Sequence, residues 1–249
     1  MNFIGIIPAR YASTRFEGKP LCKIGTKTMI ECTYNQAAKV KAFSEIVVAT
    51  DDVRIYDEVV SFGGKAVMTS PNHRSGTDRC EEAFQQLNYP SENTVIVNIQ
   101  GDEPFIKPEQ IEELTDCFSN PDIQIATLIK KIDSQEMLAN PNVVKVVISH
   151  ENKALYFSRY PVPFLRNSSF ESVDFYKHIG IYAYRADVLV ALVKIPSSAL
   201  EKAESLEQLR WLQAGYSIYT QQTQYEASVG IDTPEDWKKL KSTNCLTIC

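Results

Sequence analysis

The chain has 249 residues, of which 44% are hydrophobic and 23% are charged, and its formal net charge is −5. These proportions are those of a soluble globular protein with room for one sizeable α/β domain, or for a domain with an insertion. The acidic balance argues against general nucleic-acid binding, which usually requires a basic surface. No apolar run reaches the length of a membrane span and no signal-peptide pattern precedes the first strand, so we expect a cytoplasmic protein without a membrane partner.

Cysteine and histidine spacing gives no sign of a metal centre. The six cysteines are scattered without a CxxC pair, and the three histidines are dispersed. In a cytosolic protein such cysteines are expected to be reduced packing residues. Only Cys245 and Cys249, which lie in a polar tail, leave a metal or disulfide role open.

Apolar runs alternate with helix-period segments through the first half, a pattern typical of βαβ units and a mostly parallel sheet. The first strand is predicted at 3–7, and Thr28 with Glu31 resembles a capping box that opens a helix to about Val40. Further strands are predicted at 45–50, 66–69 and 94–99, and further helices after Asp51-Asp52, over 76–87 and from Pro108.

From about Lys131 the pattern changes. Strands are predicted at 143–149, 154–158 and 178–184, and Ser198 is predicted to cap one long helix through Ala214. A strand ending at Gly230 and a helix starting at Thr233 are predicted to follow. We therefore expect one domain over 1–249, with a nucleotide-binding core at about 1–130 and 215–249 and an inserted lobe at about 131–214.

The loop after the first predicted strand carries three cations, Arg10, Arg15 and Lys19, together with hydroxyls, a glycine and flanking prolines. Loops at the carboxyl ends of strands are where α/β proteins bind nucleotides. Three cations in such a loop are suited to a polyanion such as a triphosphate. Taken alone, the loop is equally compatible with an ordinary solvated segment.

Asp102 directly follows the fourth predicted strand, in the segment Gln100–Pro104. In a sheet ordered 3-2-1-4 the first and fourth strands are neighbours, so Asp102 should face the cationic loop. A carboxylate beside bound phosphates calls for a cation between them, and Mg²⁺ is usually held by one or two carboxylates plus phosphate oxygens. Asp232 is a candidate second ligand, although a role near the cap of the last predicted helix explains it equally well.

A third segment, Asn72–Arg79, places Ser75-Gly76-Thr77 at the start of a predicted helix. Backbone N–H groups there suit an anion or the polar edge of a base. Alone, this is a common capping sequence. Its position beside the same crevice favours a binding role.

These segments resemble the 3-deoxy-manno-octulosonate (KDO) cytidylyltransferase family. The resemblance is carried, in order, by IIPARYASTR at 6–15 with GKPL at 18–21, HRSGTDR at 73–79, VNIQGDEP at 97–104, NVVKVV at 142–147, ALYFSR at 154–159, HIGIY at 178–182, LEQLR at 206–210 and GIDTPED at 230–236. It spans almost the whole chain. Departures are local: Phe16-Glu17 stands where Leu-Pro is common, and 161–164 is variable.

The resemblance implies a Rossmann-like, three-layer nucleotide-diphospho-sugar transferase fold and transfer of CMP from CTP to KDO, giving CMP-KDO and pyrophosphate for lipopolysaccharide synthesis. It also implies Mg²⁺ as cofactor and a homodimer formed through the inserted lobe. Arg10, Arg15 and Lys19 would bind the triphosphate, with Lys19 nearest the α-phosphate, and Asp102 and Asp232 would hold the metal.

The same resemblance assigns the remaining site residues. Cytosine would be bound, largely through backbone groups, by Pro8, Ala9, Ser75, Gly76, Arg79 and Gln100. KDO would be bound by Arg159, His178, Tyr182, Glu207 and Gln208. For Tyr182 plain packing, and for Glu207 a solvated helix face, are the competing explanations.

Three alternative functions stay open at this point. The first is the same chemistry on another acidic sugar, such as 8-amino-KDO or a sialic acid, although Tyr11–Thr14 stands where sialic acid synthetases have a more glycine-rich loop. The second is a glycosyltransferase, which would need an Asp-x-Asp motif that 100–103 lacks. The third is a non-catalytic nucleotide-binding regulator.

Overall fold

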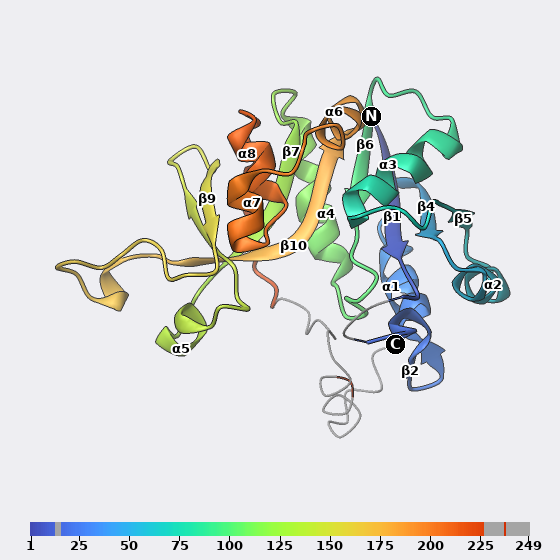
Figure 1. The fold of residues 1–249 in the computed structure, drawn as a ribbon, viewed down its shortest axis with the longest axis horizontal. Coiled ribbons are helices and arrows are strands. Elements are labelled where there is room, and N and C mark those ends of the chain that lie inside the picture. The colour runs from blue at the N-terminus through green and yellow to red at the C-terminus, as the bar shows by residue number, and fades with distance from the viewer. Residues whose placement is uncertain (13–15, 227–236, 238–249) are drawn as a thin grey trace.

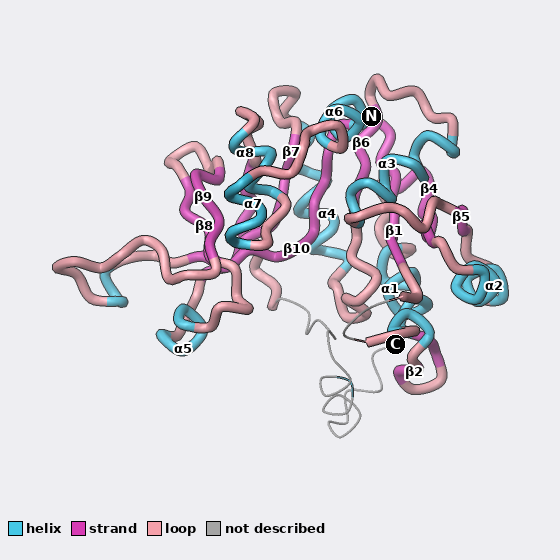
Figure 2. The backbone as a smooth tube through the Cα atoms, viewed as in Figure 1, coloured by secondary structure: helices cyan, strands magenta, loops and turns pink. Residues whose placement is uncertain are grey.

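A computed structural model describes residues 1–12, 16–226 and 237. Within these residues nine strands form one sheet with helices on both faces, giving three layers (Figure 1). The main path of the sheet runs β11-β7-β10-β6-β1-β4-β5, and β8 and β9 extend it beside β10 (Figure 2). The α/β class and the three layers predicted from the sequence are confirmed.

The first half of the chain forms the parallel part of the sheet. Its strands are β1 (Asn2–Ala9), β4 (Phe43–Thr50), β5 (Ala66–Met68) and β6 (Thr94–Asn98), and they pair in parallel in the order β5-β4-β1-β6. This is the predicted order 3-2-1-4. A small hairpin of β2 (Lys23–Ile24) and β3 (Lys27–Thr28) follows β1 and was not predicted.

The four described helices of this half start where the sequence predicts them, and side-chain caps start three of them. The helices are α1 (Met29–Ala37), α2 (Val53–Ser61), α3 (Gly76–Leu87) and α4 (Pro108–Asp116). The side chains of Thr28, Asp52 and Ser75 each accept a hydrogen bond from a backbone N–H in the first turn of α1, α2 and α3.

Alternation along β1 divides the core into two layers. Ile4 and Ile6 point to one face, where they join a cluster that includes Phe84 of α3. Ile7 and Ala9 point to the other face, which Ile30 of α1 covers together with α2 and α4. Both faces are apolar, as expected for a parallel sheet covered by helices on each side.

The second half of the chain completes the sheet in a mixed arrangement. It contains β7 (Ile125–Lys131), α5 (Gln135–Ala139), β8 (Lys145–Ile148), β9 (Ala154–Ser158), β10 (Tyr176–Arg185), α6 (Ala186–Leu192), α7 (Ala199–Glu204), α8 (Gln208–Gln213) and β11 (Tyr219–Gln222). Short 3₁₀ turns lie at Lys19–Leu21, Cys117–Ser119 and Phe170–Ser172. Strand β10 runs antiparallel to all three strands with which it pairs, β6, β7 and β8.

Strand β10 falls inside the range 131–214 that we assigned to an inserted lobe, yet it lies within the central sheet. The part that projects from the sheet is the β8–β9 hairpin with α5 and the segment 159–175, at the left of Figure 1. The boundaries at 131 and 214 stay predictions. Because β10 belongs to the central sheet, only the projecting part can be called a separate lobe.

The prediction of a single long helix from Ser198 to Ala214 is wrong. The chain forms two short helices, α7 and α8, because Ser205 adopts the left-handed conformation with φ of 52° and ends α7. Leu206, Leu209 and Trp211 are then buried in the core. Burial of these side chains offsets the strain of a non-glycine residue at positive φ.

Several predictions concern residues outside the described ranges: Arg15, Asp232, the strand ending at Gly230, the helix from Thr233, and Cys245 with Cys249. Within the described ranges, Cys80 and Cys117 are buried, and burial raises the pKa of both thiols, to about 12 for Cys117. No helix in the same ranges is both long and apolar enough to span a membrane.

Lys145, at the start of β8, is a fully buried cation. Its Nζ donates to three backbone carbonyls, those of Asn140 at 2.9 Å, Val143 at 2.7 Å and Arg159 at 2.5 Å. Burial lowers the pKa of Lys145, and the charge of Glu204 acts in the opposite direction. Lys145 therefore ties the segment before β8 to the residue that follows β9.

Replacing Lys145 should destabilise the protein. Lys145→Met leaves buried carbonyls without a donor, at a cost of about 2–4 kcal/mol. Chemical denaturation at neutral pH measures this, with the exposed Lys194→Met as the matched control. An unchanged unfolding midpoint for Lys145→Met would show that water replaces the ammonium group without loss.

Candidate active site

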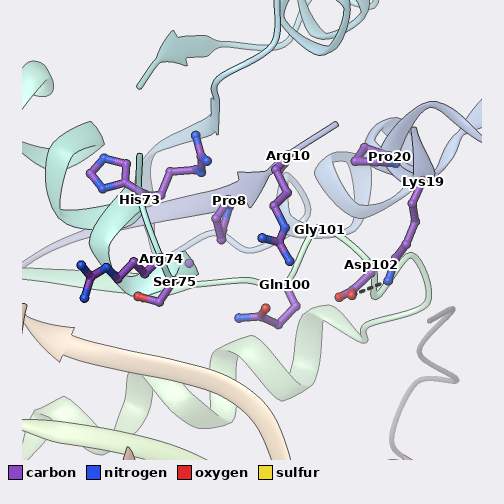
Figure 3. A pocket seen from close by; sticks show the side chains of 13 residues that line it. Pro8, Arg10, Lys19, Pro20, His73, Arg74, Ser75, Gln100, Gly101 and Asp102 are labelled. Atoms are coloured by element: carbon purple, nitrogen blue, oxygen red, sulfur yellow. Dashed lines mark hydrogen bonds and ion pairs between the residues drawn. The ribbon is translucent and has the colours of Figure 1, made fainter. Parts of the chain in front are cut away.

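A cavity of about 230 Å³ lies at the carboxyl ends of β1 and β6, beside the N-terminus of α3 (Figure 3). Nine of the predicted site residues line it: Pro8, Ala9, Arg10, Lys19, Ser75, Gly76, Arg79, Gln100 and Asp102. The structure therefore brings together three segments that are far apart in the sequence. This is the crevice expected where the strand order of an open α/β sheet reverses.

Lys19 and Asp102 form an ion pair across the cavity. The Nζ of Lys19 lies 2.6 Å from Oδ2 of Asp102, and the lysine side chain is only 11% exposed. Figure 3 shows both side chains pointing toward one another, with Arg10 beside them. The prediction that Asp102 faces the cationic loop is confirmed.

Gly101 allows the segment after β6 to approach β1. A Cβ at this position would lie 2.9 Å from the carbonyl oxygen of Pro8, closer than real Cβ contacts allow. The carbonyl of Gly101 also accepts a hydrogen bond from the Thr33 hydroxyl on α1 at 3.3 Å. The backbone carrying Asp102 is thus held between β1 and α1.

The loop before α3 forms the opposite wall of the cavity. The Glu82 carboxylate contacts the His73 ring and accepts a hydrogen bond from the Ser70 N–H at 2.8 Å. A Cβ at Gly76 would lie 3.2 Å from Cγ of Pro8, so this helix start also packs closely on the end of β1. The first N–H groups of α3 are positioned beside the cavity, where an anion or a polar base edge would be favoured.

Arg79 of α3 is buried in the wall of the cavity. Its guanidinium donates to the Thr69 hydroxyl at 2.6 Å and to the Asp51 carboxylate at 3.0 Å. These partners follow β5 and β4. Arg79 therefore joins the ends of three elements, and its charge is compensated within the protein.

The predicted sugar-binding residues lie outside the lining of this cavity, and most are near one another in the second half of the fold. The His178 ring accepts or donates a hydrogen bond at 2.9 Å with the Thr127 hydroxyl, and its centroid is 5.2 Å from that of Tyr182. Tyr182 is buried against Tyr184 and Trp211. Packing against these two rings therefore accounts for most of the surface of the Tyr182 ring.

Glu207 connects the predicted sugar-binding residues to the cavity wall. One of its carboxylate oxygens accepts a hydrogen bond from the Thr77 hydroxyl of α3 at 2.6 Å, and the other pairs with Arg210 at 2.5 Å. Burial raises the pKa of Glu207, while Thr77 and Arg210 act in the opposite direction. The explanation of Glu207 as a solvated helix face is wrong.

Arg159 is positioned by hydrogen bonds to two carbonyls and to one carboxylate, since its backbone N–H donates to the Glu204 carboxylate at 2.9 Å. Its Nε donates to the carbonyl of Glu204 at 2.8 Å, and Nη1 donates to the carbonyl of Pro141 at 3.1 Å. Gln208, at the start of α8, is buried. The structure thus places Arg159 and Gln208 at the border of the projecting segments, without bringing either to the cavity lining.

Of the two predicted metal ligands, Asp102 lies in the cavity and Asp232 lies outside the described residues. The part of the chain that the structure describes contains no group of three or more histidine, cysteine or acidic side chains suited to a metal ion. Mg²⁺ does not need one, because it is commonly held by one or two carboxylates and substrate phosphates. Asp102 beside a cationic phosphate-sized cavity fits that requirement.

Comparison with known proteins identifies the family. A cytidylyltransferase family model matches residues 4–234. A relative from Cytophaga hutchinsonii, named 3-deoxy-manno-octulosonate cytidylyltransferase, is 53% identical, with 98% of each chain covered. One of the same name from Thermodesulfovibrio yellowstonii is 49% identical, with 95% of each chain covered. The chain belongs to the 3-deoxy-manno-octulosonate cytidylyltransferase family.

Solved structures agree with this assignment. A CMP:2-keto-3-deoxy-manno-octonic acid synthetase, in complex with CTP, superposes with a TM-score of 0.90 at 43% identity, covering 97% of this cytidylyltransferase and 98% of that chain. A 4-diphosphocytidyl-2C-methyl-D-erythritol synthase from Anaerococcus prevotii superposes with a TM-score of 0.59 at 15% identity, with 97% of each chain covered. The second similarity shows the shared nucleotidyltransferase fold.

Four residues of the cavity lining were not predicted: Pro20, His73, Arg74 and Gly101. Each lies within two positions of a predicted residue in the same motif, so the motifs contained the signal. We assigned the residues whose chemistry suggested a ligand contact. The backbone close approach of Gly101 and the wall formed by His73 and Arg74 become visible only when the strands are paired.

His178 should make the free energy of unfolding of this cytidylyltransferase depend on pH. Loss of solvation lowers its pKa in the folded state to about 3, against about 6.5 in the unfolded chain. Between these values the unfolded chain binds a proton that the folded chain excludes, so the free energy of unfolding falls as pH decreases from about 6.5. Between pH 7 and pH 5 the loss is about 1–2 kcal/mol.

Denaturant unfolding at several pH values measures this slope. His178→Gln should remove that part of the pH dependence even if it changes stability at pH 7. Equal slopes for the parent and the variant would contradict the assignment of the effect to His178.

Proposed function

We propose that this protein transfers CMP from CTP to KDO and releases pyrophosphate. The observation that carries the proposal is the cavity that sets Arg10 and Lys19 opposite Asp102 at the ends of β1 and β6. Full-length relatives named for this reaction, and a similar structure described as a complex with CTP, support the nucleotide and the sugar.

In the proposed reaction the anomeric hydroxyl of KDO attacks the α-phosphorus of CTP. A new P–O bond forms, the bond to the pyrophosphate oxygen breaks in line, and the hydroxyl proton leaves to solvent or base. Such phosphoryl chemistry depends mainly on positioning and charge stabilisation. The triphosphate would lie against Arg10, Arg15 and Lys19, and Lys19 would exchange Asp102 for the α-phosphate, where negative charge develops.

Mg²⁺ is the proposed cofactor, held by Asp102 and Asp232. When bound, the metal would neutralise phosphate charge and favour ionisation of the attacking hydroxyl. The carboxylate of Asp102, which the described structure pairs with an ammonium group, already occupies a position suited to a cation. Release of Lys19 toward the phosphates would leave that carboxylate for the metal.

The two substrates would occupy neighbouring regions. Cytosine would contact Pro8, Ala9, Ser75, Gly76, Arg79 and Gln100, all of which line the cavity. The acidic sugar would contact Arg159, His178, Tyr182, Glu207 and Gln208. The hydrogen bond from Thr77 to Glu207 supports this division, because it joins α3, at the nucleotide cavity, to the start of α8.

We also propose a cytoplasmic homodimer that supplies CMP-KDO for lipopolysaccharide synthesis. The projecting part of the fold exposes large apolar side chains, with Phe164 82% exposed, Tyr160 73% and Leu155 59%. Exposed apolar groups of this size on one projecting segment are suited to contact with a second copy.

A pyrophosphate-release assay tests the proposed function. With CTP, Mg²⁺ and KDO the protein should release pyrophosphate, with 8-amino-KDO and a sialic acid as comparison substrates. A slower reaction with both comparison sugars is expected, since the relatives are named for KDO. Absence of release with KDO would refute the proposed activity.

Lys19→Ala tests the role assigned to the ion pair. Turnover should fall by about 100-fold or more, as when a preorganised group that stabilises transition-state charge is removed. The thermal midpoint should change little by comparison. The exposed Lys23→Ala serves as the control with the same charge change. A collapse of the midpoint without a specific loss of turnover would make Lys19 a structural residue.

A further inference from the structure

The ring of Tyr11 lies between the backbone of Gly18 and the guanidinium of Arg54. We propose that Arg54 and Tyr11 are positioning residues that hold the two ends of the phosphate-binding loop at the spacing required for CTP. The inference rests on the proposed function, because it assigns the loop to the triphosphate. Neither residue is among those lining the cavity in the described part of the chain, so both would act through their neighbours.

Asp52 fixes the orientation of Arg54. Oδ1 of Asp52 accepts hydrogen bonds from the backbone N–H and from Nε of Arg54, both at 2.9 Å, and Oδ2 accepts from Nη2 at 2.6 Å. Two parallel bonds from the side chain hold the planar guanidinium in one plane. Asp52 is also the N-cap of α2, so the orientation of Arg54 is set by a helix start.

The fixed guanidinium covers the ring of Tyr11. Its Cζ lies 3.3 Å from the ring centroid, a stacked cation–π contact. The Arg54 side chain is 55% exposed, and its hydrogen bonds to Asp52 raise its pKa above the ordinary value. The guanidinium therefore stays charged and covers one face of the Tyr11 ring.

Gly18 contacts both the backbone and the ring of Tyr11. Its N–H donates to the carbonyl of Tyr11 at 2.9 Å, and its φ is +68°. A Cβ on Gly18 would lie 3.1 Å from three atoms of the Tyr11 side chain. Only glycine combines this backbone conformation with contact to the ring. We call Tyr11, Gly18, Asp52 and Arg54 the loop clasp.

The loop clasp adjoins both phosphate-binding cations. Arg10 directly precedes Tyr11, and Lys19 directly follows Gly18. Both line the cavity. Holding their backbones together before the ligand arrives reduces the conformational freedom that must be lost when the triphosphate binds. The loop clasp should therefore increase affinity for CTP and leave binding of the sugar unchanged.

The test measures CTP binding by calorimetry with MgCl₂, and the KM values for CTP and KDO, in four variants. Arg54→Ala and Tyr11→Leu should each raise the Kd for CTP about tenfold, the loss expected when a preorganised loop becomes flexible. The double variant should be about as weak as either single variant, because both remove one contact. Tyr11→Phe, which keeps the ring, should stay within about twofold of the parent.

Two further readouts separate positioning from general destabilisation. The Gly18 amide should exchange its hydrogen faster in Arg54→Ala, and the KM for KDO should not change. Lys41→Ala removes one positive charge from an exposed position outside the loop clasp and is the matched control. Its Kd for CTP should equal that of the parent.

Three results would overturn the inference. Unchanged CTP affinity in Arg54→Ala and Tyr11→Leu refutes the loop clasp while the proposed function stands. Losses that add in the double variant mean that Arg54 contacts the nucleotide directly. If the parent protein neither binds CTP nor releases pyrophosphate, the proposed function fails, and the inference fails with it.

Discussion

The close approach of the segment after β6 to the end of β1 determines the geometry of the active site. The Ile99 N–H donates to the carbonyl of Ile6 at 3.0 Å, and Gly101 lets the backbone pass against the Pro8 carbonyl. Only with these strands in contact does Asp102 reach Lys19, from which it is separated by 83 positions. The Lys19–Asp102 ion pair thus depends on the strand order and on the absence of a Cβ at position 101.

The charged residues that line the cavity are mostly cations, although the chain as a whole is acidic. The protein carries a formal net charge of −5, yet four of the residues lining the cavity are Arg10, Lys19, Arg74 and Arg79. Asp51 compensates Arg79 and Asp102 compensates Lys19. A bound triphosphate would bring more negative charge than these carboxylates supply, and Arg10, Arg74, the released Lys19 and the proposed Mg²⁺ would each offset part of it. Local concentration of cations on an acidic protein also limits binding of longer polyanions.

The sequence predicted the parallel half of the fold well because its signals are local. Thr28, Asp52 and Ser75 cap helices within a few residues, and an apolar run such as that of β6 is recognisable alone. The break at Ser205 was missed because it depends on burying Leu206 and Trp211 against distant strands. The position of β10 was missed for a related reason: its antiparallel pairing with β6 joins segments that no local pattern connects.

The same distinction applies to the two halves of the site. The nucleotide residues follow strand ends in contiguous motifs, so residue chemistry and strand order sufficed to bring them together. The proposed sugar residues come from the end of β9, from β10 and from the start of α8, and their placement depends on the insertion of β10 and on the turn at Ser205. Glu207 follows that turn by two residues and accepts the hydrogen bond from Thr77 of α3. The hydrogen bond between them therefore joins the region proposed for the sugar to the cavity proposed for the nucleotide, through direct contact of α3 with the start of α8.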